Sequence, residues 1–223
     1  MSRSQATIWM VLGLVLLVAF VFMVYSLSTL SYNYEDTPVD GYMSECVEME
    51  SKYIFQELGR TGGRFINTTY NTSYLLKDEF LVPSLSEIEQ EVEQRLDNGF
   101  ERCVNNYVGP GEITILEPGY EFTYTDRSVM IEITKPYKVS TESRTVYKEA
   151  IPIELDIRLR PILEMVNETL IHYKRDGYIY DEFIIDKINI SVQKYDDGIV
   201  WEVEDRGSTE YNTPYLFKFA TII

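Results

Sequence analysis

Residues Pro83–Tyr107 (PSLSEIEQEVEQRLDNGFERCVNNY) form the stretch that decides the fold. Apolar residues recur in it every three or four positions, the period of a helix with one buried face. These residues are Leu85, Ile88, Val92, Leu96, Phe100, Cys103 and Tyr107. Pro83 and Ser84 open the predicted helix, Ser86 with Glu89 matches a capping box, and Gly109-Pro110-Gly111 ends it.

A second helix is predicted upstream, from Val39 to Leu58, and the glycines that follow it would end it. Its predicted buried face consists of Tyr42, Cys46, Met49 and Tyr53, which are four, three and four residues apart. The segment Arg64–Lys77, rich in Thr, Asn and Tyr, is predicted to be an exposed loop.

The two cysteines of the chain, Cys46 and Cys103, lie on the predicted apolar faces of these two helices. Packing of the two faces would bring the thiols together, and an even count outside the cytoplasm favours a disulfide. Such a bridge would stabilise the fold by roughly 4 kcal/mol through its 57-residue loop (103 minus 46). The alternative is two buried free thiols; no CxxC occurs, and the spacing does not suit a zinc site.

Alternation of apolar and polar residues after Gly111 predicts strands of a half-buried antiparallel sheet. The alternating apolar residues are Ile113, Ile115, Phe122, Tyr124, Val129, Ile131, Ile133, Ile151, Ile153, Leu155, Ile157 and Leu159. Turns are predicted at Glu117-Pro118-Gly119 and Thr125-Asp126-Arg127.

A third helix is predicted to start at Pro161 and to close at Asp176-Gly177. Its stripe would be Ile162, Met165, Thr169 and Tyr173. Strands resume at Ile188, turn at Asp197-Gly198 as a hairpin, and end with Leu216–Ile223.

The N-terminal run Ile8–Leu27 (IWMVLGLVLLVAFVFMVYSL) contains no charged side chain. Twenty helical residues rise roughly 30 Å, the thickness of a bilayer's hydrocarbon core, so the run predicts a membrane anchor. Arg3 precedes it, which places the N-terminus in the cytoplasm and residues 31–223 outside. The alternative is a cleaved secretory signal with Ser26 and Ser28 near the cleavage site, although the run is long for a signal.

The first residues permit a third interpretation. Arg3-Ser4-Gln5 before an apolar helix resembles the class III signal of archaeal type IV pilins, which would be cut between Ser4 and Gln5. Pilins usually carry a Glu near the fifth mature position, where this chain has Trp9. That difference argues against a filament subunit.

The composition restricts the function. With 36 acidic against 20 basic residues, the formal charge is −16, which disfavours nucleic acid and anionic lipid headgroups as partners. A solvated acidic surface explains the excess of acidic residues. Calcium binding is the more specific alternative, but the sequence has no D-x-D-x-D-G loop. We expect no cofactor and no metal.

Catalytic signatures are equally sparse. His172 is the only histidine and is predicted within the third helix, where a structural role is the usual one. None of the motifs GxSxG, HExxH or GxxxxGK[ST] occurs. A glycosidase needs only two carboxylates, so an anchored hydrolase acting through acidic residues stays an alternative.

The chain is rich in tyrosine, with 18 residues, a type favoured at interfaces and in carbohydrate contacts. Those predicted in exposed stretches are Tyr32, Tyr34, Tyr70, Tyr74, Tyr211 and Tyr215. The alternative is a compositional habit of the source organism. Among four N-x-[ST] sequons, Asn67 and Asn71 lie in the predicted loop and are the better glycosylation candidates; Asn167 and Asn189 fall in a helix and a strand.

Three segments taken in order resemble uncharacterised single-pass membrane proteins of small-genome archaea. These are the Gln5-led apolar helix, the Glu45-Cys46 helix ending at Gly62-Gly63, and the Pro83 helix with Cys103. The resemblance covers about the first half of the chain and implies architecture and location, but no reaction.

These observations predict an α+β protein with an N-terminal transmembrane helix, two disulfide-linked helices, and a mainly antiparallel sheet with one further helix. The predicted divisions are a cytoplasmic segment 1–7, an anchor 8–27, a linker 28–41, a helical subdomain 42–108 and a sheet subdomain 111–223. The predicted function is a non-enzymatic interaction or structural protein of the cell surface. Its partners would be membrane lipid, through residues 8–27, and an envelope protein, a glycan or itself.

Overall fold

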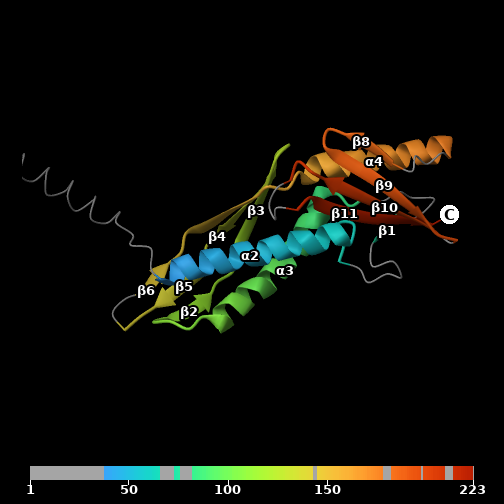
Figure 1. Cartoon of the computed structure of the whole chain (residues 1–223). Coiled ribbons are helices and arrows are strands. Elements are labelled where there is room, and N and C mark those ends of the chain that lie inside the picture. The colour runs from blue at the N-terminus through green and yellow to red at the C-terminus, as the bar shows by residue number, and fades with distance from the viewer. Residues whose placement is uncertain are drawn as a thin grey trace, which may run out of the picture. The chain divides into compact units, whose positions relative to one another are not determined.

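The computed structural model describes residues 38–65, 73–75, 82–142, 145–177, 182–196, 198–208 and 213–222. Residues 38–223 form one compact unit. The described part has an α+β fold, as predicted, but its strands form three sheets where the sequence predicted one (Figure 1). Its helices are α2 (Pro38–Arg60), α3 (Leu85–Asn106) and α4 (Leu159–Asp176). Its strands are β1 (Ser73–Leu75), β2 (Glu112–Ile115), β3 (Gly119–Tyr124), β4 (Val129–Thr134), β5 (Tyr137–Ser140), β6 (Thr145–Tyr147), β7 (Ala150–Leu155), β8 (Glu182–Ile185), β9 (Ile188–Lys194), β10 (Gly198–Asp205) and β11 (Tyr215–Ile222).

Helix α3 carries the predicted stripe and opens at Ser84, as predicted, but its capping box differs from the predicted one. Ser84 is the N-cap: its hydroxyl accepts from the Glu87 N–H at 3.3 Å, and the Glu87 carboxylate accepts from the Ser84 N–H at 2.8 Å. The predicted capping box at Ser86 and Glu89 was therefore wrong by two positions. Two S-x-x-E matches overlap here, and the earlier one wins because it extends the backbone hydrogen bonds of the helix.

Helix α2 buries a different face from the one predicted. Its buried apolar residues are Val39, Met43, Val47, Ile54, Phe55 and Leu58. Met49 and Tyr53 stay 57% and 53% exposed, so the predicted face was wrong for both. The predicted face and the buried face both have helical spacing, and they are neighbours on the helix. The sheets cover the face whose residues are mostly aliphatic.

The disulfide between Cys46 and Cys103 is confirmed, with the two Cα atoms 5.9 Å apart. It joins α2 to α3, which lie side by side (Figure 1). The hydroxyl of Tyr42 donates to the carbonyl oxygen of Cys103 at 3.1 Å. Cys103 is fully buried and Cys46 half-buried, so the bridge sits at the edge of the interhelical core.

The sheet of β3, β4 and β7 is antiparallel, and one of its faces is buried. The predicted alternation is confirmed for Ile151, Ile153 and Leu155 on β7, which are buried. It was wrong beyond Leu155, where the strand ends: Ile157 lies outside it and Leu159 begins α4. Tyr120 on β3 donates its hydroxyl to Asp97 of α3 at 2.6 Å, which connects this sheet to the helix.

The sheet of β2, β5 and β6 contacts the first turn of α2 through Tyr137 of β5. The buried Tyr137 hydroxyl donates to Asp40, itself only 3% exposed, at 2.8 Å. Lys148 lies 3.7 Å from the same carboxylate. This contact holds α2 in place from Pro38, so the end of the predicted linker 28–41 is helical.

The largest sheet has the order β1-β11-β10-β9-β8. Strand β1 pairs in parallel with β11, so the predicted loop Arg64–Lys77 contains a strand and that prediction was wrong. Period-2 patterning is weak in so short a strand, and only the partner β11 defines it. The predicted hairpin at Asp197-Gly198 is confirmed by the antiparallel pairing of β9 with β10.

Helix α4 begins at Leu159, so Pro161 lies inside its first turn instead of opening it. It ends as predicted at Gly177, whose positive φ of 63° closes the helix. Tyr173 on α4 contacts Trp201 of β10 edge to face, with ring centroids 5.9 Å apart. The stripe of α4 therefore covers the sheet that contains β10.

The predicted segments 1–7 and 8–27 and the predicted cleavage residues Ser4 and Gln5 lie outside the described residues. Within the residues that are described, none of the helices has the length and apolarity needed to cross a bilayer.

Candidate functional site

The tyrosines predicted to be exposed give one clear correction. Tyr215 is 3% exposed, and its hydroxyl donates to the backbone carbonyl of Phe55 on α2 at 2.8 Å. It is a core residue because α2 packs directly on β11. Of the other predicted positions, Tyr32, Tyr34, Tyr70 and Tyr211 lie outside the described residues, as does the side chain of Tyr74.

His172 lies on the exposed side of α4, as its predicted position in the third helix implies. Its Nδ1 is 2.8 Å from the Arg175 guanidinium and 3.8 Å from the Asp176 carboxylate. In the described part of the chain, no group of His, Cys, Asp or Glu side chains is arranged to hold a metal ion.

Two of the four sequons lie within the described residues and two lie outside them. Asn167 is exposed on α4, but its sequon partner Thr169 is 8% exposed, and the Thr169 hydroxyl donates to the Met165 carbonyl. Asn189 is half-buried in β9. Asn67 and Asn71 lie outside the described residues.

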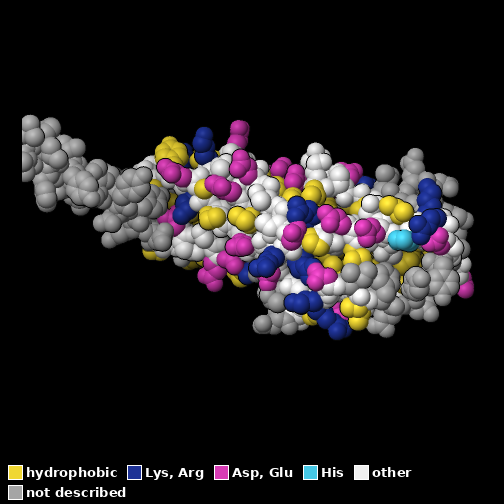
Figure 2. Space-filling view, turned by 90° about the horizontal axis from the view of Figure 1, so that it is seen from above, with side chains coloured by type: hydrophobic (Ala, Val, Ile, Leu, Met, Phe, Trp, Pro, Cys, Tyr) yellow, Lys and Arg dark blue, Asp and Glu magenta, His cyan; other side chains and the backbone are white. Residues whose placement is uncertain are grey.

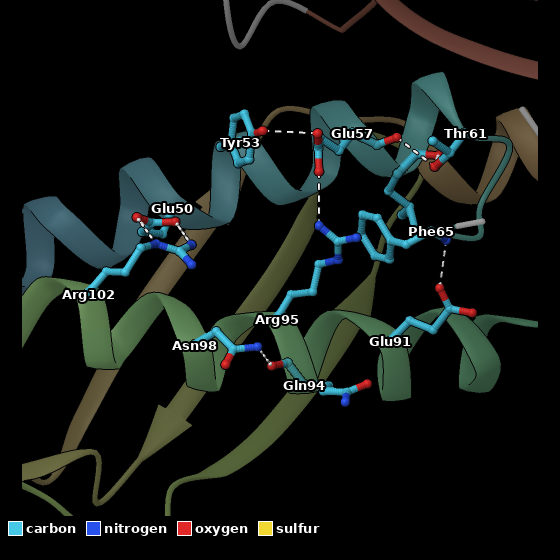
Figure 3. Close-up of polar contacts among 11 residues, drawn as sticks. Glu50, Tyr53, Glu57, Thr61, Phe65, Glu91, Gln94, Arg95, Asn98 and Arg102 are labelled. Atoms are coloured by element: carbon cyan, nitrogen blue, oxygen red, sulfur yellow. Dashed lines mark hydrogen bonds and ion pairs between the residues drawn. The ribbon is translucent and has the colours of Figure 1, made fainter. Parts of the chain in front are cut away.

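A groove of about 920 Å³ lies between α2 and α3, and we call it the interhelical groove. This volume falls in the range of ~300–1,000 Å³ that is usual for small-ligand sites. Its lining residues are Cys46, Met49, Glu50, Tyr53, Ile54 and Glu57 of α2, Phe65 beyond the helix, and Glu91, Gln94, Arg95, Asn98 and Arg102 of α3. Figure 3 shows the polar contacts among most of them.

Two ion pairs cross the groove from one helix to the other (Figure 3). Arg102 binds Glu50 through two hydrogen bonds, Nε to Oε1 at 3.1 Å and Nη2 to Oε2 at 2.5 Å. Arg95 donates to Glu57 at 2.9 Å. The bidentate bond to Glu50 raises the pKa of Arg102. These pairs fix the spacing of the two helices over the length of the groove.

Aromatic rings lie beside the ion pairs. The Arg95 guanidinium carbon lies 3.6 Å from the centre of the Phe65 ring, a cation–π contact. The Phe65 backbone N–H donates to Glu91 at 2.9 Å. Tyr53 donates its hydroxyl to Glu57 at 2.9 Å, and this hydrogen bond raises the pKa of Tyr53 above its ordinary value. Tyr53 therefore presents a neutral, fixed ring at the surface.

The groove carboxylates bear on the hydrolase alternative. Glu50 and Glu57 are paired with arginines, and Glu91 accepts a backbone N–H. A glycosidase nucleophile needs an open approach to its substrate, and each of these three carboxylates already accepts a hydrogen bond.

A second cavity of about 510 Å³ surrounds Arg158 at the start of α4. Arg158 contacts Asp186 at 2.5 Å and the fully buried Asp205 at 3.4 Å, while Ser208 donates to Asp205 at 2.6 Å. These bonds join the start of α4 to the β8–β9 turn and the end of β10. We assign this cluster a structural role.

The groove was not predicted from the sequence, although the spacing of the charged residues on the two helices contains a signal for it. Glu50 and Glu57 are seven residues apart on α2, and Arg95 and Arg102 are seven apart on α3. Two helices linked antiparallel at Cys46 and Cys103 would bring these complementary pairs together. The charge pattern alone does not show that they line a groove.

Acidic side chains are spread along the face of the molecule in Figure 2, with hydrophobic side chains between them. Comparison with known protein families, curated proteins and solved structures finds no match to this chain. The archaeal resemblance therefore stays a prediction, and the function is argued from the chain itself.

Proposed function

We propose that this chain is a single-pass membrane protein whose folded unit, residues 38–223, lies on the extracytoplasmic side and binds a component of the cell envelope. The observation that carries the proposal is the uncharged run Ile8–Leu27, preceded by Arg3. In water such a helix would expose apolar surface on every side, and a bilayer removes that cost.

The disulfide supports the location. Cys46 and Cys103 are bonded in the interhelical core, and structural disulfides persist in oxidising compartments. A reducing cytosol would work against this bond. An extracytoplasmic folded unit agrees with the cytoplasmic N-terminus that Arg3 predicts.

Binding is favoured over catalysis by the interhelical groove. It combines exposed Met49 and Tyr53 with arginines, residue types enriched at recognition surfaces. Its carboxylates are engaged by Arg95, Arg102 and the Phe65 backbone. Among the residues that the structure describes, no contact gives comparable support to the pilin-like or the hydrolase alternative.

The location is tested in intact cells that express the full chain. A membrane-impermeant amine reagent should label lysines of residues 38–223, and the protein should sediment with membranes. Leu17→Lys places a charge in the middle of the run at a cost of about 3 kcal/mol to insertion and should release the protein, whereas Leu17→Ala should not. Unlabelled lysines in a cytosolic protein would overturn the proposal.

Intact mass separates the three interpretations of the N-terminus. An uncleaved anchor begins at Met1 or Ser2, a secretory product begins near Ser28, and prepilin processing begins at Gln5. A mature chain that starts at Gln5 would favour the pilin-like alternative.

A further inference from the structure

Tyr53 has the properties of a binding platform. It is 53% exposed on α2, yet its hydroxyl is tied to Glu57 at 2.9 Å. Glu57 is in turn held by Arg95 of the neighbouring helix at 2.9 Å. An aromatic ring fixed in this way loses little conformational freedom when a ligand stacks on it, which favours binding.

The α3 wall of the groove supplies hydrogen-bonding groups. Gln94 and Asn98 are exposed and line the groove together with Arg95 and Arg102. Amide groups both donate and accept, while the paired arginines and carboxylates keep further donor and acceptor positions. The groove therefore offers apolar area on α2 beside mixed polar groups on α3.

The two bridging ion pairs decide which class of ligand fits. An amphipathic helix laid into the groove would remove water from Glu50–Arg102 and Glu57–Arg95, and burial of ion pairs is costly. An anionic polymer would meet the field of a chain with net charge −16. Neither ligand suits this surface.

A neutral saccharide meets both conditions. Its hydroxyls donate and accept, so they can replace water on the ion pairs and amides without breaking them. Its ring C–H faces need apolar surface, which the Tyr53 ring and the adjacent Met49 supply. Its lack of charge avoids repulsion by the acidic chain.

We infer that the interhelical groove is a binding site for a neutral glycan, with Tyr53 as the stacking platform and Gln94 and Asn98 as hydrogen-bonding groups. The inference rests on the proposed function, since it names the class of envelope component that the extracytoplasmic unit binds. The chain could be anchored and exported without binding glycan, so the two fail separately.

The test uses the full chain in phospholipid nanodiscs, because detergents with sugar headgroups would compete for the groove. The probe is the neutral hexamer of N-acetylglucosamine, titrated by calorimetry, with an oligogalacturonate of similar length as the anionic comparison. We expect the neutral oligomer to bind and the anionic one to bind at least about tenfold more weakly.

Variants locate the site. Tyr53→Ala should weaken binding about tenfold or more, and Tyr53→Phe, which keeps the ring and loses the bond to Glu57, should weaken it less. Tyr195→Ala is the matched control: Tyr195 is 44% exposed, and its hydroxyl is bonded to Gln193 at 2.9 Å. It should bind like the wild type.

Three results would overturn the inference. The first is that the folded, disulfide-bonded chain does not bind the neutral oligomer. The second is that the Tyr53→Ala variant binds the oligomer as tightly as the Tyr195→Ala variant. The third is a dimer in sedimentation that dissociates on Tyr53→Ala, which would assign the groove to a second copy of the chain.

Discussion

The contact between α2 and β11 makes a prediction that runs against helix propensity. Gly59 lies in the last turn of α2, where a Cβ would collide with the Leu216 carbonyl oxygen and come within 2.7 Å of the Tyr215 hydroxyl. A glycine to alanine change inside a helix ordinarily stabilises it. Here the new methyl would press on the backbone of a sheet strand.

The magnitude follows from these two effects. The propensity gain is at most about 1 kcal/mol, whereas overpacking against well-packed neighbours costs about 1–3 kcal/mol. The nearest atom is a backbone oxygen of strand β11, which cannot move aside as a flexible side chain can, so the cost belongs at the upper end. We expect Gly59→Ala to lower the free energy of unfolding by about 2 kcal/mol.

Gly41 provides the matched control, because it lies in the same helix and a Cβ there would meet nothing within 4 Å. Gly41→Ala should leave stability unchanged or raise it by up to about 1 kcal/mol. Gly99→Ala should fall between the two, since its nearest contact is the Glu50 Cβ at 3.3 Å, on a side chain that can move.

Urea unfolding of the full chain in nanodiscs, followed by fluorescence of the buried Trp201, measures the three variants. A loss of about 2 kcal/mol corresponds to a fall in midpoint of about 1 M urea for a typical slope. Equal or greater stability of Gly59→Ala than of Gly41→Ala would refute the reasoning and the close approach of α2 to β11.

Reduction of the Cys46–Cys103 bond should lower the free energy of unfolding by roughly 4 kcal/mol, because its 57-residue loop regains chain entropy; urea midpoints that coincide with and without reductant would contradict this. Tyr215→Phe should cost about 1–3 kcal/mol in the same assay, since it leaves a buried carbonyl of α2 unpaired, and an unchanged midpoint would count against that bond. The hydrogen bond from the Ser84 backbone depresses the folded-state pKa of Glu87. Its stabilisation is therefore present above the unfolded pKa of about 4.3 and disappears as the pH falls through the lower folded pKa. NMR titration should find the Glu87 carboxyl below its ordinary value, and Glu87→Gln should remove this part of the pH profile of stability; a carboxyl that titrates at or above its ordinary value would disprove it.

Local spacing predicted much of the fold. The stripe from Ile88 to Cys103, the alternation at Ile151, Ile153 and Leu155, and the closure of α4 at Gly177 all appear as expected. These features depend on neighbours within a few residues, where helix and strand periods differ clearly.

The errors share a cause. Met49 and Tyr53 have helical spacing but lie one or two positions away from the buried residues of α2. Tyr215 looked like a residue of an exposed tail, yet β11 carries it under α2. Ser73–Leu75 is a strand only because β11 pairs with it. In each case the outcome was decided by a partner distant in the chain.

The candidate site was predictable in its parts but not as a site. The even cysteine count and the two helical stripes anticipated the link between α2 and α3. The rotation of each helix about its axis, and therefore the facing of Glu50 to Arg102 and of Glu57 to Arg95, follows from packing on the sheets. Periodicity constrains a helix face only to within about one residue, or ~100°.

Residue order alone indicated the three helices of the folded unit, most of its strands and the uncharged run Ile8–Leu27, because each depends on local pattern, and it favoured the cysteine pairing by simple counting. Folding in three dimensions determined which surfaces are covered and which groups meet. Burial and hydrogen-bond geometry are collective properties of segments up to 160 residues apart, as between Phe55 and Tyr215. No short stretch contains that information.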